Sequence, residues 1–234
     1  MLIRSDYNSI CQLKKSVLLT RSKAANSALK EKFGNKDLDL IECNLIEYEL
    51  FSVEAEYINQ FSDLVITSNF AANNIPDAPR ANMPVWVVGE KSANILKNKG
   101  YKVKFYASNV ENLKRRIPDH LYNTMLYLSG DHITVSMPLG TTRKILYKTI
   151  YLKLLSENEM IRYKEGIDYI VLYSENCAKT LLKLLIENNL VNYLGNTTYI
   201  AISSKVARVF EQVFKNVVVC HDTDSMLKYI EKHD

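Results

Sequence analysis

The sequence contains one pattern twice, at a constant spacing. Residues 84–113 and 198–227 align without a gap at an offset of 114 residues. Each copy predicts an apolar strand, a small or polar turn, a helix, a second β-branched strand and a polar cap. The two helices share a lysine and an alanine at equivalent positions, namely Lys91 and Ala93, and Lys205 and Ala207. A period of this length is too long for a solenoid, so we expect two related domains whose equivalent loops face one another across a cleft.

A related pattern precedes each copy and extends the similarity between the two halves of the chain. Residues 63–71 (DLVITSNFA) resemble residues 168–178 (DYIVLYSENCA) with a one-residue slip. The chain has 234 residues, which exceeds the usual size of a single small domain. The length and the repeat together favour two small α/β domains.

Composition narrows the class of protein further. Hydrophobic residues make up 47% of the chain and charged residues 24%, which is ordinary for a globular protein and excludes disorder. The cysteines and histidines are scattered without C-x-x-C or metal-ligand spacing, and they are Cys11, Cys43, Cys177 and Cys220, and His120, His132, His221 and His233. We therefore expect a reduced, cytoplasmic protein without a metal site.

No part of the sequence predicts a membrane segment. No apolar run approaches the ~20 residues of a membrane span, and polar residues through Lys15 leave no signal-peptide core. We expect residues 1–15 to form an extension ahead of the first strand. The net charge of +4 suits an anionic ligand, although solvated lysine faces explain it as well.

The order of predicted elements places one domain inside the other. Residues 16–20 (SVLLT) are continuously apolar, as in a strand buried on both faces of a parallel sheet. The N-terminal segment predicts two strands, which alone do not form a stable domain. We therefore expect residues 16–20 to share a sheet with three strands near the C-terminus. The predicted fold class is α/β, with two similar parallel-sheet α/β/α domains joined by a two-strand linker. The expected boundaries are 1–43 plus 154–234 for the discontinuous domain, 51–146 for the inserted domain, and 44–50 and 147–153 for the linker strands.

Three local signals predict helix boundaries. Residues 21–33 predict a helix that Gly34 ends, and residues 51–61 carry apolar side chains at helical spacing. Ser156 and Glu159 have the spacing of a capping box, which predicts a helix that ends at Gly166.

Polar residues gather where predicted strands lead into helices. The carboxyl ends of strands line the ligand crevice of an open parallel sheet, and the helix that begins there offers free N–H groups to carboxylates or phosphates. Helix capping alone also explains the enrichment in Ser, Thr and Asn. The six turns are Thr20-Arg21-Ser22, Thr67-Ser68-Asn69, Gly89-Glu90-Lys91-Ser92, Ser129-Gly130-Asp131, Ser174-Glu175-Asn176 and Ser203-Ser204.

Familiar catalytic motifs are missing. The sequence has no G-x-G-x-x-G, G-x-x-x-x-G-K-[ST], G-x-S-x-G or H-E-x-x-H, which disfavours nucleotide-using transferases, esterases and zinc hydrolases. Lys114-Arg-Arg116 is one short basic cluster at a helix end, so it gives little support to nucleic-acid binding. An enzyme with this sequence is expected to work mainly by shaping and holding its substrate.

The ordered series of segments resembles uroporphyrinogen-III synthase, a family of tetrapyrrole (haem) biosynthesis. The resemblance runs from about Ser16 to the C-terminus, and its segments are SVLLTR, NLIEYEL, DLVITSNFA, VWVVGEKSANILKNKGYKV, MLYLSGD, KTIYLKL, YIVLYSENCA and YIAISSKVARVF. It implies a lyase (a cyclising hydro-lyase) that needs no cofactor. The implied reaction converts hydroxymethylbilane, a linear tetrapyrrole with eight carboxylates, to uroporphyrinogen III with inversion of the last ring and loss of water. It also implies a monomer that contacts the preceding pathway enzyme transiently.

The resemblance carries over to particular residues. The tyrosine that follows the second linker strand of the family falls on Tyr151, which is the candidate for assisting departure of the hydroxyl group. The candidate substrate-binding residues, together with Arg21 from the first turn, are Thr67, Ser68, Asn69, Gly89, Ser92, Ser129, Gly130, Ser174, Ser203 and Ser204. Tyr173 departs from the usual threonine, which puts a side-chain hydroxyl contact there in doubt. The main alternative is a non-catalytic two-domain binding module or sensor for a small anionic metabolite.

Overall fold

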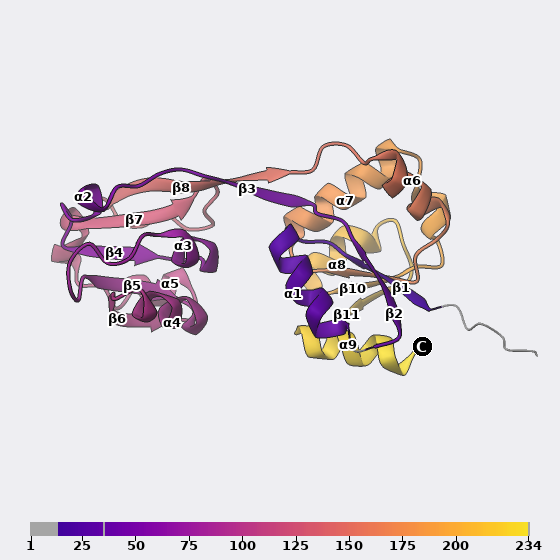
Figure 1. The fold of residues 1–234 in the computed structure, drawn as a ribbon, viewed down its shortest axis with the longest axis horizontal. Coiled ribbons are helices and arrows are strands. Elements are labelled where there is room, and N and C mark those ends of the chain that lie inside the picture. Colours follow the sequence, from indigo (N-terminus) through magenta and orange to yellow (C-terminus); the bar gives the residue numbers. More distant parts are fainter. Residues whose placement is uncertain (1–13, 35, 234) are drawn as a thin grey trace, which may run out of the picture. The chain divides into compact units, whose positions relative to one another are not determined.

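The computed structural model describes residues 14–34 and 36–233 (Figure 1). Most of the expected N-terminal extension, residues 1–13, therefore lies outside the described residues. The chain divides into two compact units. Unit 1 combines the residues up to Glu47 with Tyr151–Asp234, and unit 2 is formed by Tyr48–Ile150. The expectation of a mixed α/β fold with parallel sheets is confirmed.

Unit 1 contains a five-stranded sheet in which every strand pair is parallel. Its order is β11 (Val217–Val219), β10 (Thr198–Ala201), β9 (Tyr169–Leu172), β1 (Lys15–Leu19) and β2 (Leu38–Glu42). The apolar run of the N-terminal segment forms β1, which lies between β9 and β2, and its side chains from Val17 to Leu19 are buried. A strand covered on both faces has no polar side to present, which explains the continuous apolar sequence.

Helices cover both faces of this sheet. They are α1 (Lys23–Phe33), α6 (Glu157–Lys164), α7 (Glu175–Glu187), α8 (Ser204–Glu211) and α9 (Thr223–Lys232), with a 3₁₀ turn at Val191–Leu194. Alternate residues of β9 face opposite cores. Ile170 packs with residues of α6, α7 and α8, whereas Val171 packs with residues of α1 and α9. The unit is therefore a three-layer α/β/α sandwich.

Unit 2 contains a six-stranded sheet. Its order is β3 (Ile46–Leu50), β8 (Thr142–Tyr151), β7 (Met125–Gly130), β4 (Asp63–Ile66), β5 (Pro84–Val88) and β6 (Lys102–Ala107). The helices are α2 (Ala55–Ile58), α3 (Asn69–Asn74), α4 (Glu90–Asn98) and α5 (Val110–Lys114), with a 3₁₀ turn at Asp119–Thr124. One core includes buried residues of α2, α3 and α4, and the other lies under α5 and the 3₁₀ turn.

The internal repeat is confirmed at the level of secondary structure. Strands β5 and β10 begin at Pro84 and Thr198, and helices α4 and α8 begin at Glu90 and Ser204, so both pairs keep the offset of the sequence alignment. Leu96 and Phe210 occupy equivalent positions, and both are fully buried. Each copy therefore supplies the same strand–helix–strand–helix segment to one of the two sheets.

The helix predicted over residues 51–61 is wrong in length, because α2 spans only Ala55–Ile58. At its start, the Phe51 backbone N–H donates to the Leu146 carbonyl at 2.8 Å and keeps the chain extended. At its end, the Arg80 guanidinium donates to the carbonyl oxygens of Asn59, Phe61 and Ser62, at 2.9 to 3.1 Å. These tertiary contacts bond backbone groups that lie outside α2 on either side.

The other helix-boundary signals agree with the structure more closely. The capping box is confirmed, since Ser156 Oγ accepts from the Glu159 N–H and the Glu159 carboxylate accepts from the Ser156 N–H. The helix ends at Lys164, two residues before Gly166. Gly34 follows α1 as expected, but with a φ of −65° rather than a left-handed conformation.

No helix among the described residues has both the length and the apolar character that a bilayer crossing requires. The cysteines within that part of the chain are all unpaired, with Cys43 and Cys177 buried and Cys220 half-buried. Cys11 lies outside the described residues.

Replacement of Phe210 by alanine is expected to destabilise unit 1 by about 3 to 5 kcal/mol. The ring is fully buried and packs against Tyr199 and Phe214, with centroid distances of 4.8 and 5.7 Å, so truncation leaves a cavity. Denaturant unfolding followed by far-ultraviolet circular dichroism measures the loss. Val213→Ala is the control, since this side chain is 42% exposed. A loss below about 1 kcal/mol for Phe210→Ala would contradict this account of the core.

Candidate functional site

In unit 2, the turn after β4 is held by two tyrosines from other strands. Ser68 caps α3 by accepting from the Ala71 N–H at 3.1 Å, and it also accepts from the Tyr147 hydroxyl at 3.1 Å. Thr67 Oγ1 shares a hydrogen bond of 2.8 Å with the Tyr127 hydroxyl. Burial raises the pKa of Tyr127 despite the opposing effects of that hydrogen bond and of Arg143, so its phenol is neutral at physiological pH. Thr67 and Ser68 therefore lie in a network of neutral hydroxyl groups.

Asn69 is exposed on the first turn of α3, and its neighbour in α4 fixes its orientation. Ser92 Oγ donates to Asn69 Oδ1 at 2.5 Å, and Ser92 itself is only 1% exposed. This contact occupies the amide oxygen and leaves the Asn69 amide nitrogen available as a donor. In this arrangement Ser92 orients Asn69, and Asn69 is the group that a ligand can reach.

Gly89 forms the turn between β5 and α4 with a φ of +89°, a conformation that favours glycine. Its backbone N–H donates to the Ala107 carbonyl at 2.9 Å, so that donor is already used. Gly89 therefore shapes this turn, and the free donors at the turn belong to the residues that follow it in α4.

Ser129 and Gly130, at the end of β7, are both buried. Ser129 Oγ donates to the Gly130 carbonyl at 2.9 Å and accepts from Arg143 Nε at 2.8 Å. A Cβ at Gly130 would lie 2.6 Å from Cζ of Tyr147, so the missing side chain makes room for that ring. These two residues thus support Arg143 and Tyr147 and are not themselves open to a ligand in this conformation.

Sequence reasoning did not identify Tyr147, Arg143 or the aromatic rings beside them. Tyr147 packs against Tyr48 and Phe70, with ring centroids 5.5 and 4.7 Å away, and those two rings are 4.0 Å apart. The Arg143 guanidinium also donates to the carbonyl oxygens of Gly130 and Asp131, at 2.7 and 2.8 Å. The alternating pattern of β8 could have indicated that its side chains face two surfaces, but it does not specify their partners.

In unit 1, the turn after β1 is fixed by a buried asparagine. Asn26 is fully buried, and its Oδ1 accepts from the Arg21 backbone N–H at 2.9 Å while its Nδ2 donates to Asn44 Oδ1 at 2.9 Å. The Arg21 guanidinium lies 4.8 Å from the centroid of the Tyr173 ring, a cation–π contact. The half-buried cation is therefore placed at the carboxyl end of β9 without a carboxylate partner among the described residues.

Tyr173 takes the position at which the resemblance leads one to expect a threonine. Its hydroxyl donates to Thr223 Oγ1 at 3.3 Å, and burial raises the pKa of the phenol. The hydroxyl is therefore engaged with α9, and the ring face is in contact with the Arg21 guanidinium. Tyr173 thus positions the cation, which a threonine at this place would not do.

The turn after β9 carries a capped helix and an ion-pair cluster. Ser174 caps α7 by accepting from the Cys177 N–H at 3.1 Å. Glu175 accepts from Lys179 at 2.5 Å and from Lys205 at 2.6 Å, and these two ammonium groups lower the pKa of Glu175 to about 2. Glu175 is therefore ionised at neutral pH, and an anionic ligand at this turn would compete with it for Lys205.

Ser203 begins α8 without making a side-chain capping hydrogen bond, unlike Ser68 and Ser174. Ser203 is half-buried and Ser204 is exposed. The Val206 N–H instead donates to the Ser203 carbonyl at 3.0 Å, so the donors open to a ligand are the N–H groups of Ser204 and Lys205. The helices that follow Ser22 and Gly89 also begin without a side-chain cap.

Tyr151, the candidate catalytic residue, is the last residue of β8, and its hydroxyl contacts the first turn of α7. Its hydroxyl accepts from Asn176 Nδ2 at 3.0 Å. This bond holds the phenol beside the N-terminus of α7. The structure thus brings Arg21, Tyr151, Ser174, Ser203 and Ser204 into unit 1, and the remaining candidates, at the ends of β4, β5 and β7, into unit 2.

Within residues 14–34 and 36–233, no group of three or more His, Cys, Asp or Glu side chains is arranged to hold a metal ion. The candidate residues of the two units offer neutral phenols and hydroxyls, backbone and amide donors, and the cations Arg21 and Lys205.

Comparison with known proteins gives a consistent result. The family model described as uroporphyrinogen-III synthase HemD matches residues 27–228. An uncharacterised protein of Rickettsia prowazekii (strain Madrid E) is 34% identical, over 88% of this chain and 93% of its own length.

Solved structures share the fold. Uroporphyrinogen-III synthetase from Helicobacter pylori superposes with a TM-score of 0.61 at 16% identity, covering 95% of this chain and all of that one. A mutant uroporphyrinogen III synthase from the extreme thermophile Thermus thermophilus gives a TM-score of 0.52 at 16% identity, covering 93% of this chain and 98% of that one. Since the family model spans most of the sequence and these structures have the same fold, the chain belongs to the uroporphyrinogen-III synthase family.

Proposed function

We propose that this protein is an enzyme that cyclises hydroxymethylbilane to uroporphyrinogen III, with inversion of the terminal pyrrole ring and release of water. Membership of the family over residues 27–228 is the observation that carries the proposal. The alternative, a non-catalytic binding module or sensor, has no observation in its favour. The proposed reaction makes the protein a lyase of tetrapyrrole biosynthesis.

Each unit contains donors that suit the proposed substrate. The linear tetrapyrrole carries eight carboxylates, which are suited to guanidinium groups, amide N–H groups and open helix N-termini. Arg21 and the first turn of α8 provide such donors in unit 1, and Asn69 provides an amide in unit 2. Holding the flexible tetrapyrrole in a folded conformation brings its reacting carbon atoms together, which supplies much of the rate enhancement.

The proposed chemical step begins with loss of the terminal hydroxyl group. The Tyr151 phenol donates its proton to that hydroxyl, so the C–O bond breaks and water leaves. The electron pair of the adjacent pyrrole nitrogen stabilises the resulting azafulvene cation. The substituted α-carbon of the last ring attacks this cation and forms a spiro intermediate. Its original bond to the bridging methylene then breaks, which leaves a second azafulvene cation on the neighbouring ring. The free α-carbon of the inverted ring attacks that cation, and loss of the proton on this carbon restores the aromatic pyrrole. Proton donation and proton loss balance, so no cofactor is consumed.

The product isomer tests the proposal. The protein supplied with freshly prepared hydroxymethylbilane is expected to give the type III isomer, whereas the spontaneous reaction gives type I. Chromatography of the oxidised products separates the two isomers, and a heat-denatured sample gives the spontaneous background. Type I product alone, from folded protein, would refute the proposed function.

Tyr151→Phe is expected to lower turnover by about 10²-fold or more, the usual contribution of a proton donor, without loss of folded structure. Asn176 holds the hydroxyl that the variant lacks. Tyr193→Phe is the matched control, because this tyrosine also lies in unit 1 and is 51% exposed. Type III formation at the wild-type rate in Tyr151→Phe would remove Tyr151 from the mechanism.

Gly130→Ala is expected to reduce type III formation by displacing the Tyr147 ring, since the new Cβ would lie 2.6 Å from it. Gly195→Ala is the control, because a Cβ there meets nothing within 4 Å. In a Tyr147→Leu background, Gly130→Ala should have little further effect, and the double-mutant cycle measures that coupling. Equal effects of Gly130→Ala in both backgrounds would show that Tyr147 is not the residue through which Gly130 acts.

A further inference from the structure

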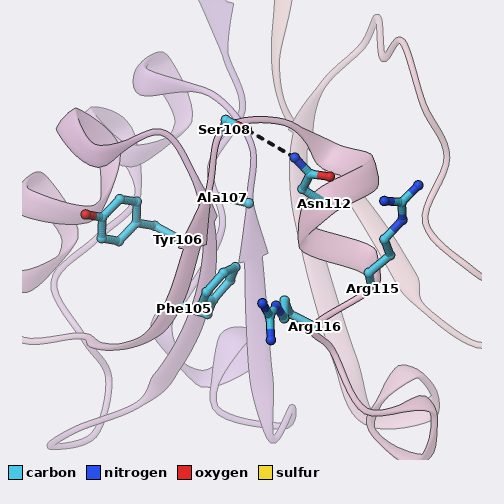
Figure 2. A pocket seen from close by; sticks show the side chains of 7 residues that line it. All are labelled: Phe105, Tyr106, Ala107, Ser108, Asn112, Arg115 and Arg116. Atoms are coloured by element: carbon cyan, nitrogen blue, oxygen red, sulfur yellow. Dashed lines mark hydrogen bonds between the residues drawn. The ribbon is translucent and has the colours of Figure 1, made fainter.

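A cavity of about 370 Å³ lies in unit 2 between the carboxyl end of β6 and helix α5 (Figure 2). Phe105 and Ala107 provide its apolar wall, and Ser108, Asn112, Arg115 and Arg116 provide its polar groups. Its volume falls within the range of small-molecule sites. The backbone of Ala107 accepts from the Gly89 N–H at 2.9 Å, so the cavity adjoins a turn of the candidate functional site but is not part of it.

The charge of the cavity is positive. Arg115 and Arg116 are both exposed, and no acidic side chain lines the cavity. Glu111, the acidic residue of α5, pairs instead with Lys114 at 3.5 Å. Within the described residues neither arginine forms an ion pair, so two guanidinium groups remain for an anion. Guanidinium groups bind carboxylate and phosphate through paired N–H donors.

Neighbouring side chains hold the polar groups in place. The Arg116 guanidinium lies 5.5 Å from the centroid of the Phe105 ring, and Figure 2 shows the two side chains next to each other. Asn112 Nδ2 donates to Ser108 Oγ at 3.2 Å, which leaves the Ser108 hydroxyl proton and the second Asn112 amide proton as donors. Tyr106 points to the other side of the strand in Figure 2, so Phe105 is the aromatic surface that faces α5.

We propose that this cavity binds a small anion that carries carboxylate or phosphate groups next to an apolar portion. The two guanidinium groups and the Ser108 hydroxyl contact the anionic groups, and the apolar portion packs against Phe105. This site is separate from the proposed reaction, and its occupancy does not depend on the identity of the substrate. A basic helix end that is merely solvated would produce no saturable binding.

The sequence provides an internal probe for the test. Trp86 is the only tryptophan in the chain and the cross-strand partner of Phe105. Both side chains belong to the same hydrophobic cluster, so binding against Phe105 should alter the Trp86 fluorescence. Phenyl phosphate and phenylacetate, each with one anionic group next to an apolar ring, are titrated separately at constant ionic strength, and calorimetry provides a second readout. We expect saturable binding of at least one probe with a midpoint below roughly 1 mM, the upper end of common metabolite affinities.

Variants identify the groups responsible. R115A/R116A is expected to weaken binding at least about tenfold, and R115K/R116K to weaken it less, because lysine keeps the charge but loses the paired donors. K97A/K102A is the matched control, since it removes two exposed charges from the same unit, one of them at the opposite end of β6. The tighter probe identifies the anionic group. Absence of saturable binding for both probes, or equal binding by R115A/R116A and wild type, would overturn the proposal.

Discussion

The main-chain pairing of β1 with β9 is the interaction on which the rest of unit 1 depends. It joins residues Val17–Leu19 to Tyr169–Val171, which are about 150 positions apart in the chain. Asp168 strengthens the junction by accepting from the backbone N–H and the hydroxyl of Ser16, both at 2.9 Å. Parallel strands end at the same edge of their sheet, so the pairing brings Arg21 to the Tyr173 ring. Without this pairing, Arg21 and the Tyr173 ring would not be in contact.

The sequence alone predicted those features that depend on local pattern. The apolar run of β1, the capping box at Ser156 and the duplicated strand–helix–strand–helix segment arise from periodicity and from neighbouring residues. The length of α2 could not be predicted in this way, because the contacts on either side of it involve Arg80 and Leu146, which are distant in sequence. The hydrogen bond of Tyr147 to Ser68 spans 79 residues and leaves no local signal. Contacts of that kind are set by the register of strands that are distant in sequence.

Serine residues illustrate why residue type does not specify a role. Ser68 and Ser174 cap helices, Ser92 orients Asn69, and Ser129 is buried under Arg143. A buried hydroxyl forms its hydrogen bonds with groups inside the protein. Such a serine therefore positions neighbouring residues and does not contact a ligand. Ser203 also precedes a helix, yet its side chain makes no capping hydrogen bond to α8. Burial and capping, which only the structure provides, separate these roles.

The insertion of unit 2 between the two parts of unit 1 also sets an order for synthesis. When Tyr151 has left the ribosome, every strand of the unit 2 sheet exists, so this sheet can form during translation. At that time β1 and β2 have only each other, because β9, β10 and β11 are still to be made. Their exposed edge is then a surface to which another chain could add. The interval between Tyr151 and Val219 is therefore the period in which the nascent protein depends most on protection against aggregation.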